Sequence, residues 1–89
     1  MLVALIARDK LGHIEVRKAT LADHKDYLNS DTAVSQAGPL LSDEGEMIGS
    51  LIILDVNVLE DARAGSENDP YVKVGLFESV EFILWNKVI

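Results

Sequence analysis

The sequence contains no cysteine and only two histidines among its 89 residues. The absence of cysteine excludes disulfide bonds, thiolate nucleophiles and cysteine-based zinc sites. His13 and His24 do not have the His-x-His or His-x3-His spacing of transition-metal sites, so we expect no bound metal. A glycine-rich phosphate-binding loop is missing as well.

Positive charge is also scarce. The sequence has 8 Lys and Arg residues and 15 Asp and Glu residues, so its formal charge is −7. Without a basic stripe, this balance argues against a nucleic-acid or anionic-lipid partner. No apolar run approaches the ~20 residues that span a bilayer. The apolar start of the chain lacks a basic region before it and is stopped by residues 8–10, so it is not typical of a signal peptide. We therefore expect a cytoplasmic protein.

The composition that remains is that of a folded protein, with 48% apolar and 26% charged residues. No internal repeat or linker divides the chain, which predicts one domain over residues 1–89. A domain this short buries a small fraction of its surface, so a partner subunit would add stability.

The first half of the chain predicts a strand, a helix and a hairpin. A strand over residues 2–8, buried on both faces, ends at a polar turn. Thr20, with Asp23 three residues later, predicts the start of a helix over about 20–30. A hairpin follows, in which Ala33 to Leu41 and the apolar run Ile48 to Val56 flank a polar loop.

The second half predicts one more helix and one more strand. Asn57, with Glu60, predicts a second capped helix, which ends before Pro70. Alternation over residues 80–85 predicts a last strand. The resulting order, βαββαβ, is that of a ferredoxin-like α+β fold with an antiparallel sheet and both helices on one face.

Apolar residues point to both faces of this predicted sheet. Ile83 and Trp85 alternate with Phe82, whereas a sheet with one solvated face would show polar residues at every second position. We therefore expect the second face to be covered by an identical subunit in a twofold dimer.

His24 is the first candidate for chemistry, because it lies on or beside the apolar stripe of its helix. Imidazole titrates near ~6.5 in model peptides, which suits it to move protons near neutral pH, and burial favours the neutral form that acts as a base. The alternative is a core histidine that is hydrogen-bonded to a carbonyl group.

Two charged residues offer partners for such a base. Asp69, in a turn stiffened by Pro70, is suited to orient a histidine and stabilise its cation, although Asp before Pro is also a common turn starter. Arg17, which we place before the first helix, is suited to bind a substrate carboxylate through two hydrogen bonds. A solvated surface arginine is the alternative.

Two pairs, Gly38-Pro39 and Gly49-Ser50, occupy mirrored places in the hairpin. Glycine there permits a bulge or a close backbone approach, and Ser50 can donate a hydrogen bond. Strand geometry explains the glycines equally well. A hydrolase triad of Ser50, His24 and Asp69 is disfavoured, because Ser50 lacks the second glycine of a nucleophile elbow and a following helix.

Taken together and in order, these residues resemble the YciI-like (YCII-related) family of bacterial proteins over essentially the whole chain. The matching residues are the strand start at 2–6, Arg17, His24, Ala37 to Leu40, Gly49-Ser50, Asp69-Pro70-Tyr71, Gly75 to Phe77 and Trp85 to Ile89.

The resemblance implies a dimeric α+β barrel with a cleft in which a histidine and an aspartate meet, and these roles fall on His24 and Asp69. It also places a set of residues near the cleft as substrate-binding groups, namely Arg17, Gly38, Pro39, Ser50 and Tyr71. One relative is a dehydrochlorinase of a chlorinated hydroxyquinol, which implies lyase chemistry without a metal or organic cofactor.

Our leading hypothesis is therefore a cofactor-independent lyase or isomerase that acts on a small oxygenated, possibly aromatic, anion. In it, His24 abstracts a proton, Asp69 supports the imidazolium, and Arg17 or Ser50 anchors the substrate. Two alternatives stay open, a small-molecule binding or sensing module and a purely structural dimer. The sequence also leaves open whether the dimers associate into a higher oligomer.

Overall fold

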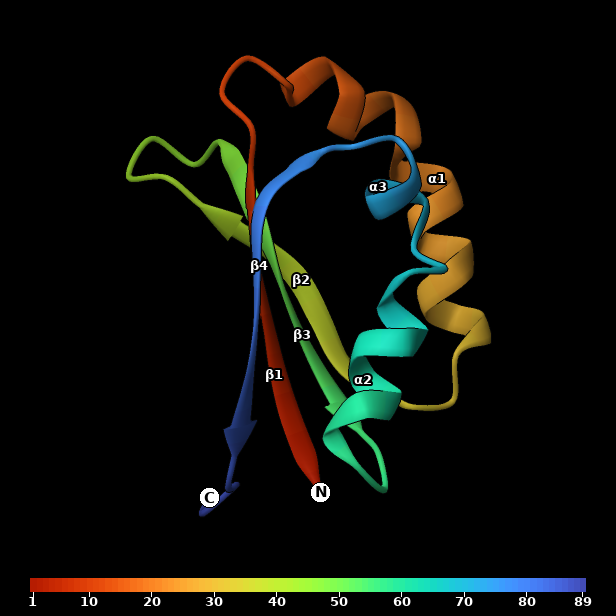
Figure 1. Ribbon diagram of the computed structural model, residues 1–89. Coiled ribbons are helices and arrows are strands. Elements are labelled where there is room, and N and C mark those ends of the chain that lie inside the picture. Colours follow the sequence, from red (N-terminus) through yellow and green to blue (C-terminus); the bar gives the residue numbers. More distant parts are fainter.

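A computed structural model describes residues 1–89 and shows the predicted order of elements with one helix added. In chain order the elements are β1 (Leu2–Asp9), α1 (Ile14–Ser30), β2 (Val34–Leu41), β3 (Met47–Asp55), α2 (Leu59–Ser66), α3 (Pro70–Lys73) and β4 (Phe77–Trp85). All three helices lie on one side of the sheet (Figure 1). The predicted ferredoxin-like α+β fold, of the dimeric α+β barrel class, is confirmed.

The four strands form one sheet in the order β2-β3-β1-β4, and every neighbouring pair is antiparallel. Strand β2 lies at the edge, where its Pro39 pairs with Ser50 of β3. Proline has no N–H group to donate to a further strand, so an edge position suits it.

The core lies between the sheet and the helices, and β1 supplies its centre. Val3, Leu5 and Ala7 are buried, whereas the residues that alternate with them are only half-buried. We expected β1 to be buried on both faces, and the single chain covers only one. The remaining buried members of this core are Ile52, Leu54 and Ala62.

The face of the sheet opposite the helices is apolar and open in the single chain. Leu51, Ile83 and Trp85 belong to it by strand alternation and are 38%, 45% and 42% exposed. The predicted surplus of apolar residues on both faces is therefore present. We call this surface the open face.

Helix α1 begins at Ile14, so the predicted start near Thr20 is wrong, and Arg17 lies inside the helix rather than before it. His13 occupies the N-cap position and makes no capping hydrogen bond with its side chain. The buried residues of α1 are Arg17, Thr20 and His24, which are polar. The capping pattern of Thr20 and Asp23 misplaced the start, because the first turns of α1 bury polar residues and show no apolar stripe.

The other helix boundaries also differ from prediction. Val58 rather than Asn57 precedes α2, and no side chain caps that helix. The turn expected at Asp69 is the start of α3, because the Asp69 carboxylate accepts the backbone N–H of Tyr71 and Pro70 fills the first helical position. Strand β4 starts three residues before the predicted position 80. None of the helices is both long and apolar enough to cross a membrane.

Gly49 marks a close approach between β3 and β1, and we expect Gly49→Ala to be destabilising. A Cβ atom there would collide with the carbonyl oxygen of Ala7 and would lie 3.2 Å from Cδ1 of Leu40. Because backbone atoms cannot move aside, the cost should be that of an overpacked core, about 1–3 kcal/mol in the free energy of unfolding measured in urea.

Gly65 provides the matched control for that measurement. It lies within α2, and a Cβ atom there meets nothing within 4 Å. Gly65→Ala should therefore stabilise the protein, by roughly 0.5–1 kcal/mol, through helix propensity. Equal stability of the two variants would contradict the close approach at Gly49.

Candidate functional site

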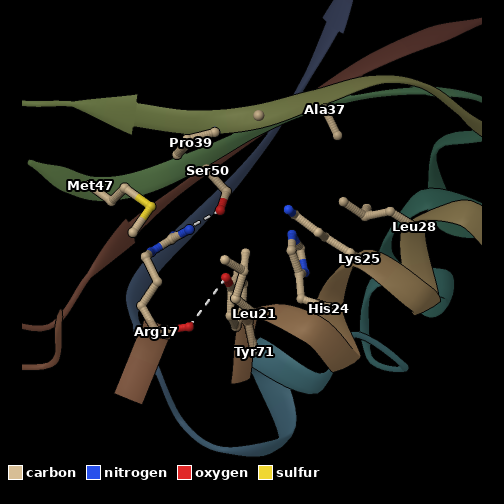
Figure 2. Close-up of a pocket in the computed structure, with 11 residues that line it drawn as sticks. Arg17, Leu21, His24, Lys25, Leu28, Ala37, Pro39, Met47, Ser50 and Tyr71 are labelled. Carbon is tan, nitrogen blue, oxygen red and sulfur yellow. Dashed lines mark hydrogen bonds between the residues drawn. The ribbon is translucent and has the colours of Figure 1, made fainter. Parts of the chain in front are cut away.

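A pocket of about 160 Å³ lies between α1, the strands β2 and β3, and α3 (Figure 2). Six of the seven predicted site residues line it, namely Arg17, His24, Gly38, Pro39, Ser50 and Tyr71. The other lining residues are Leu21, Lys25, Leu28, Ala37 and Met47. The fold thus brings residues from both halves of the chain to one place.

Asp69, the seventh predicted residue, lies behind the pocket and holds His24. The Nδ1 atom of His24 lies 2.8 Å from Oδ1 of Asp69, and the two residues are 6% and 2% exposed. The same oxygen accepts the N–H of Tyr71 at 2.9 Å. An ionised carboxylate only accepts hydrogen bonds, so Nδ1 must carry the ring proton. In the neutral ring, Nε2 is then unprotonated and available as a base.

Tyr71 fixes the plane of the His24 ring. The two rings stack with centroids 3.9 Å apart and planes 18° from parallel, and the guanidinium carbon of Arg17 lies 4.6 Å from the Tyr71 ring centre. Burial raises the pKa of the Tyr71 phenol above its usual value. Tyr71 is therefore a neutral aromatic support at ordinary pH.

A second tyrosine, Tyr27, joins α1 to α2 outside the pocket. Tyr27 donates its O–H to the carbonyl oxygen of Gly65 at 2.9 Å. Burial first, and then the nearby carboxylates of Asp31 and Asp69, raise the pKa of Tyr27 to about 12. This phenol is a structural donor and takes no part in lining the pocket.

Arg17 is buried and its charge is balanced within the protein. Its Nε and Nη2 atoms donate to the two carboxylate oxygens of Asp9 at 2.7 and 2.9 Å, and the side chain is 2% exposed. The alternative of a solvated arginine is thus wrong. Sequence reasoning missed Asp9, which resembled an ordinary turn residue after the first strand.

Ser50 is oriented by Arg17. The Nη2 atom of Arg17 donates to Oγ of Ser50 at 2.8 Å. Arginine has no acceptor, so Ser50 must be the acceptor in this bond. The hydroxyl proton of Ser50 then has no protein partner and is available to a molecule in the pocket.

Two further polar residues are Lys25 and His13. Lys25 lines the pocket, although its acidic neighbours Asp23 and Asp26 in the sequence are typical of a solvated helix side. His13 lies outside the pocket. It is half-buried, its Nδ1 lies 3.0 Å from the Leu11 carbonyl oxygen, and it borders a different groove. No group of three or more His, Asp or Glu side chains is arranged to hold a metal ion.

Comparison with solved structures places the pocket in a known fold. The chain matches 5-chloro-2-hydroxyhydroquinone dehydrochlorinase of Burkholderia phenoliruptrix, in complex with 2,5-dihydroxybenzoquinone, with a TM-score of 0.87 and 29% identity over 97% of this chain and 94% of that one. A Nitrosomonas europaea protein, whose name suggests an antibiotic biosynthesis monooxygenase, has a TM-score of 0.60 and 16% identity, with all of both chains covered. This second likeness shows the fold alone.

Comparison with protein sequences identifies the family. Protein YciI of Escherichia coli O6:H1 is 31% identical to the chain over 97 aligned positions, which cover 99% of each protein. The model of the YCII-related domain matches residues 1–86. The resemblance inferred from the motifs is thereby confirmed: the chain belongs to the YciI-like family of YCII-related domain proteins.

Proposed function

We propose that this protein is a cofactor-independent lyase that removes a proton from a small, oxygenated, one-ring substrate. The observation that carries the proposal is the buried His24–Asp69 pair at the pocket, because an Nδ1 that donates to Asp69 would leave Nε2 free to take a proton. Asp69 would hold the ring tautomer and stabilise the imidazolium after proton transfer.

The size and lining of the pocket support a one-ring substrate. A cavity of about 150 Å³ in another protein binds benzene, and this pocket measures about 160 Å³. Leu21, Leu28 and Met47 offer apolar contact to the face of a ring. The dehydrochlorinase that shares the fold at 29% identity holds 2,5-dihydroxybenzoquinone, which is also a single oxygenated ring.

Loss of hydrogen chloride is the reaction class that these groups fit best. One hydroxyl proton of the ring would first move to the chlorine-bearing carbon, which gives a ketone. His24 Nε2 would then take a second hydroxyl proton, and the electron pair left on that oxygen would expel chloride as the quinone forms. The proton stays on His24 until it passes to solvent, so the net change is loss of HCl and no oxidant is required. Ser50 would donate its free O–H to the substrate oxygen on which negative charge develops.

The direct test is turnover of 5-chloro-2-hydroxyhydroquinone by the purified protein without added metal or cofactor. We expect release of chloride, measured with a chloride electrode, and formation of a quinone, measured by absorbance. Recovery of the bound compound unchanged would instead favour the binding or sensing module. A protein that neither binds nor converts it would exclude this substrate.

We also propose that the open face is covered by a second copy of the chain. Its exposed residues Leu51, Ile83 and Trp85 lie on β3 and β4, the two strands that flank β1. Contact of water with such an apolar surface is unfavourable. Light scattering at micromolar concentration should give twice the mass of one chain, and Ile83→Asp should give a folded monomer.

Leu11 supplies the control for the dimer experiment. It is 94% exposed but lies in the turn after β1, away from the open face. Leu11→Asp adds the same charge and should leave the mass unchanged. A wild-type monomer, or equal loss of mass in both variants, would contradict the proposal.

A further inference from the structure

The pocket has two cations on its wall, and only one has its charge unbalanced. Arg17 is bound to both carboxylate oxygens of Asp9. Lys25 forms no ion pair, since none of the salt bridges in the structure includes it. Of these two cations, only Lys25 thus offers the pocket a positive charge that has no partner in the protein.

The orientation of Lys25 brings this charge into the site. In Figure 2 its side chain extends from α1 toward the strands, and its nitrogen lies on the side of the pocket where Ser50 lies. The neighbouring residue, His24, contributes the candidate base from the same helix turn. One molecule in the pocket can therefore meet the base, the Ser50 hydroxyl and the ammonium group together.

The charge of the whole chain makes a local cation necessary for an anionic ligand. The formal charge is −7, and this excess repels anions at long range. The two carboxylates bonded to residues that line the pocket are already engaged, Asp9 with Arg17 and Asp69 with His24. Lys25 is the group left to favour a negatively charged ligand over a neutral one.

We propose that Lys25 is the specificity-determining residue of this site, binding an oxyanion of the substrate while Ser50 donates a hydrogen bond to it. This inference rests on the proposed function and names its substrate class, a one-ring molecule that binds as an anion. Arg17, assigned above as a substrate anchor from the sequence, is then a positioning residue that orients Ser50 and supports Tyr71.

Binding of unreactive probes tests Lys25 without any turnover. By calorimetry, the wild type should bind 2,5-dihydroxybenzoquinone, which is an anion at neutral pH, more tightly than resorcinol, a neutral ring. Lys25→Met should weaken binding of the anion by roughly 10- to 100-fold, the range of a hydrogen bond to a charged group, and leave resorcinol unaffected. Lys25→Arg should keep most of the preference. Added benzoate distinguishes a carboxylate from a ring oxyanion as the preferred charge.

Lys18 provides a control of equal charge on the same helix. It is exposed, lies 4.0 Å from Glu15 and does not line the pocket. Lys18→Met should leave both affinities unchanged. The proposal is overturned if the wild type binds 2,5-dihydroxybenzoquinone and resorcinol equally tightly, or if Lys25→Met keeps the preference for the anion. It is also overturned if Lys18→Met loses as much of this preference as Lys25→Met does.

The outcome is separable from that of the proposed function. Chloride release reports on turnover, whereas the anion preference reports on Lys25 alone. A preference that depends on Lys25, in a protein that releases no chloride, would uphold this inference and refute the lyase. Salt adds a further readout, because screening should reduce the anion preference of the wild type and have no such effect in Lys25→Met.

Discussion

His24→Asn is expected to lower kcat for the chlorinated hydroxyquinol by roughly 10²–10⁴-fold, the range of general acid–base catalysis. Asparagine keeps a polar side chain at this place but offers no nitrogen that can take a proton at neutral pH. The fold should be retained, as measured by circular dichroism. Activity is measured as the initial rate of chloride release at saturating substrate.

A second variant separates the role of His24 from a general effect of losing a histidine. The loss of kcat should be confined to His24→Asn. His13→Asn is the control, because His13 borders another groove. An unchanged rate in His24→Asn would refute the assignment of the base.

Asp69→Asn tests the support of the base separately from the fold. Asparagine is as good an N-cap as aspartate, so α3 should keep its start at Pro70. The amide oxygen in the place of Oδ1 can still accept from His24 Nδ1 and from the Tyr71 N–H, but asparagine lacks the negative charge that stabilises the imidazolium. We expect a loss of kcat with little loss of stability, and a loss of stability alone would make Asp69 only a helix cap.

The order of the elements could be predicted because strands and helices differ in apolar periodicity. Strand β1 is almost continuously apolar, and the hairpin of β2 and β3 has a polar loop at its end. The errors lie where polar residues are buried. Arg17, Thr20 and His24 form the buried side of α1, so hydrophobicity carries no sign of where that helix begins.

The candidate site was predictable only in part. His24 and Asp69 lie 45 positions apart, and the family resemblance, rather than their spacing, suggested that they meet. Asp9 and Lys25 carried no signal, because a carboxylate in a turn and a lysine between acidic residues look like ordinary surface groups. Their roles depend on tertiary packing, which places Asp9 against Arg17 and turns Lys25 toward the strands.

Arg17→Leu is expected to cause the largest loss of stability, about 3–5 kcal/mol in the free energy of unfolding. The substitution leaves the Asp9 carboxylate buried without its cation, and it removes the support of Ser50 and Tyr71. Small domains have only roughly 5–15 kcal/mol of stability in total, so the variant should unfold at much lower urea concentration.

The double variant Asp9→Asn/Arg17→Leu distinguishes an unpaired charge from lost packing. Removing both charges should recover a large part of the loss, because the cost of breaking a buried pair lies mainly in the partner left behind. Arg63→Leu is the control, since its pair with Glu60 at 3.4 Å is exposed and should be worth at most about 1 kcal/mol. If Arg17→Leu lowered the free energy of unfolding no more than Arg63→Leu does, the pair of Arg17 with Asp9 would not be a main source of stability.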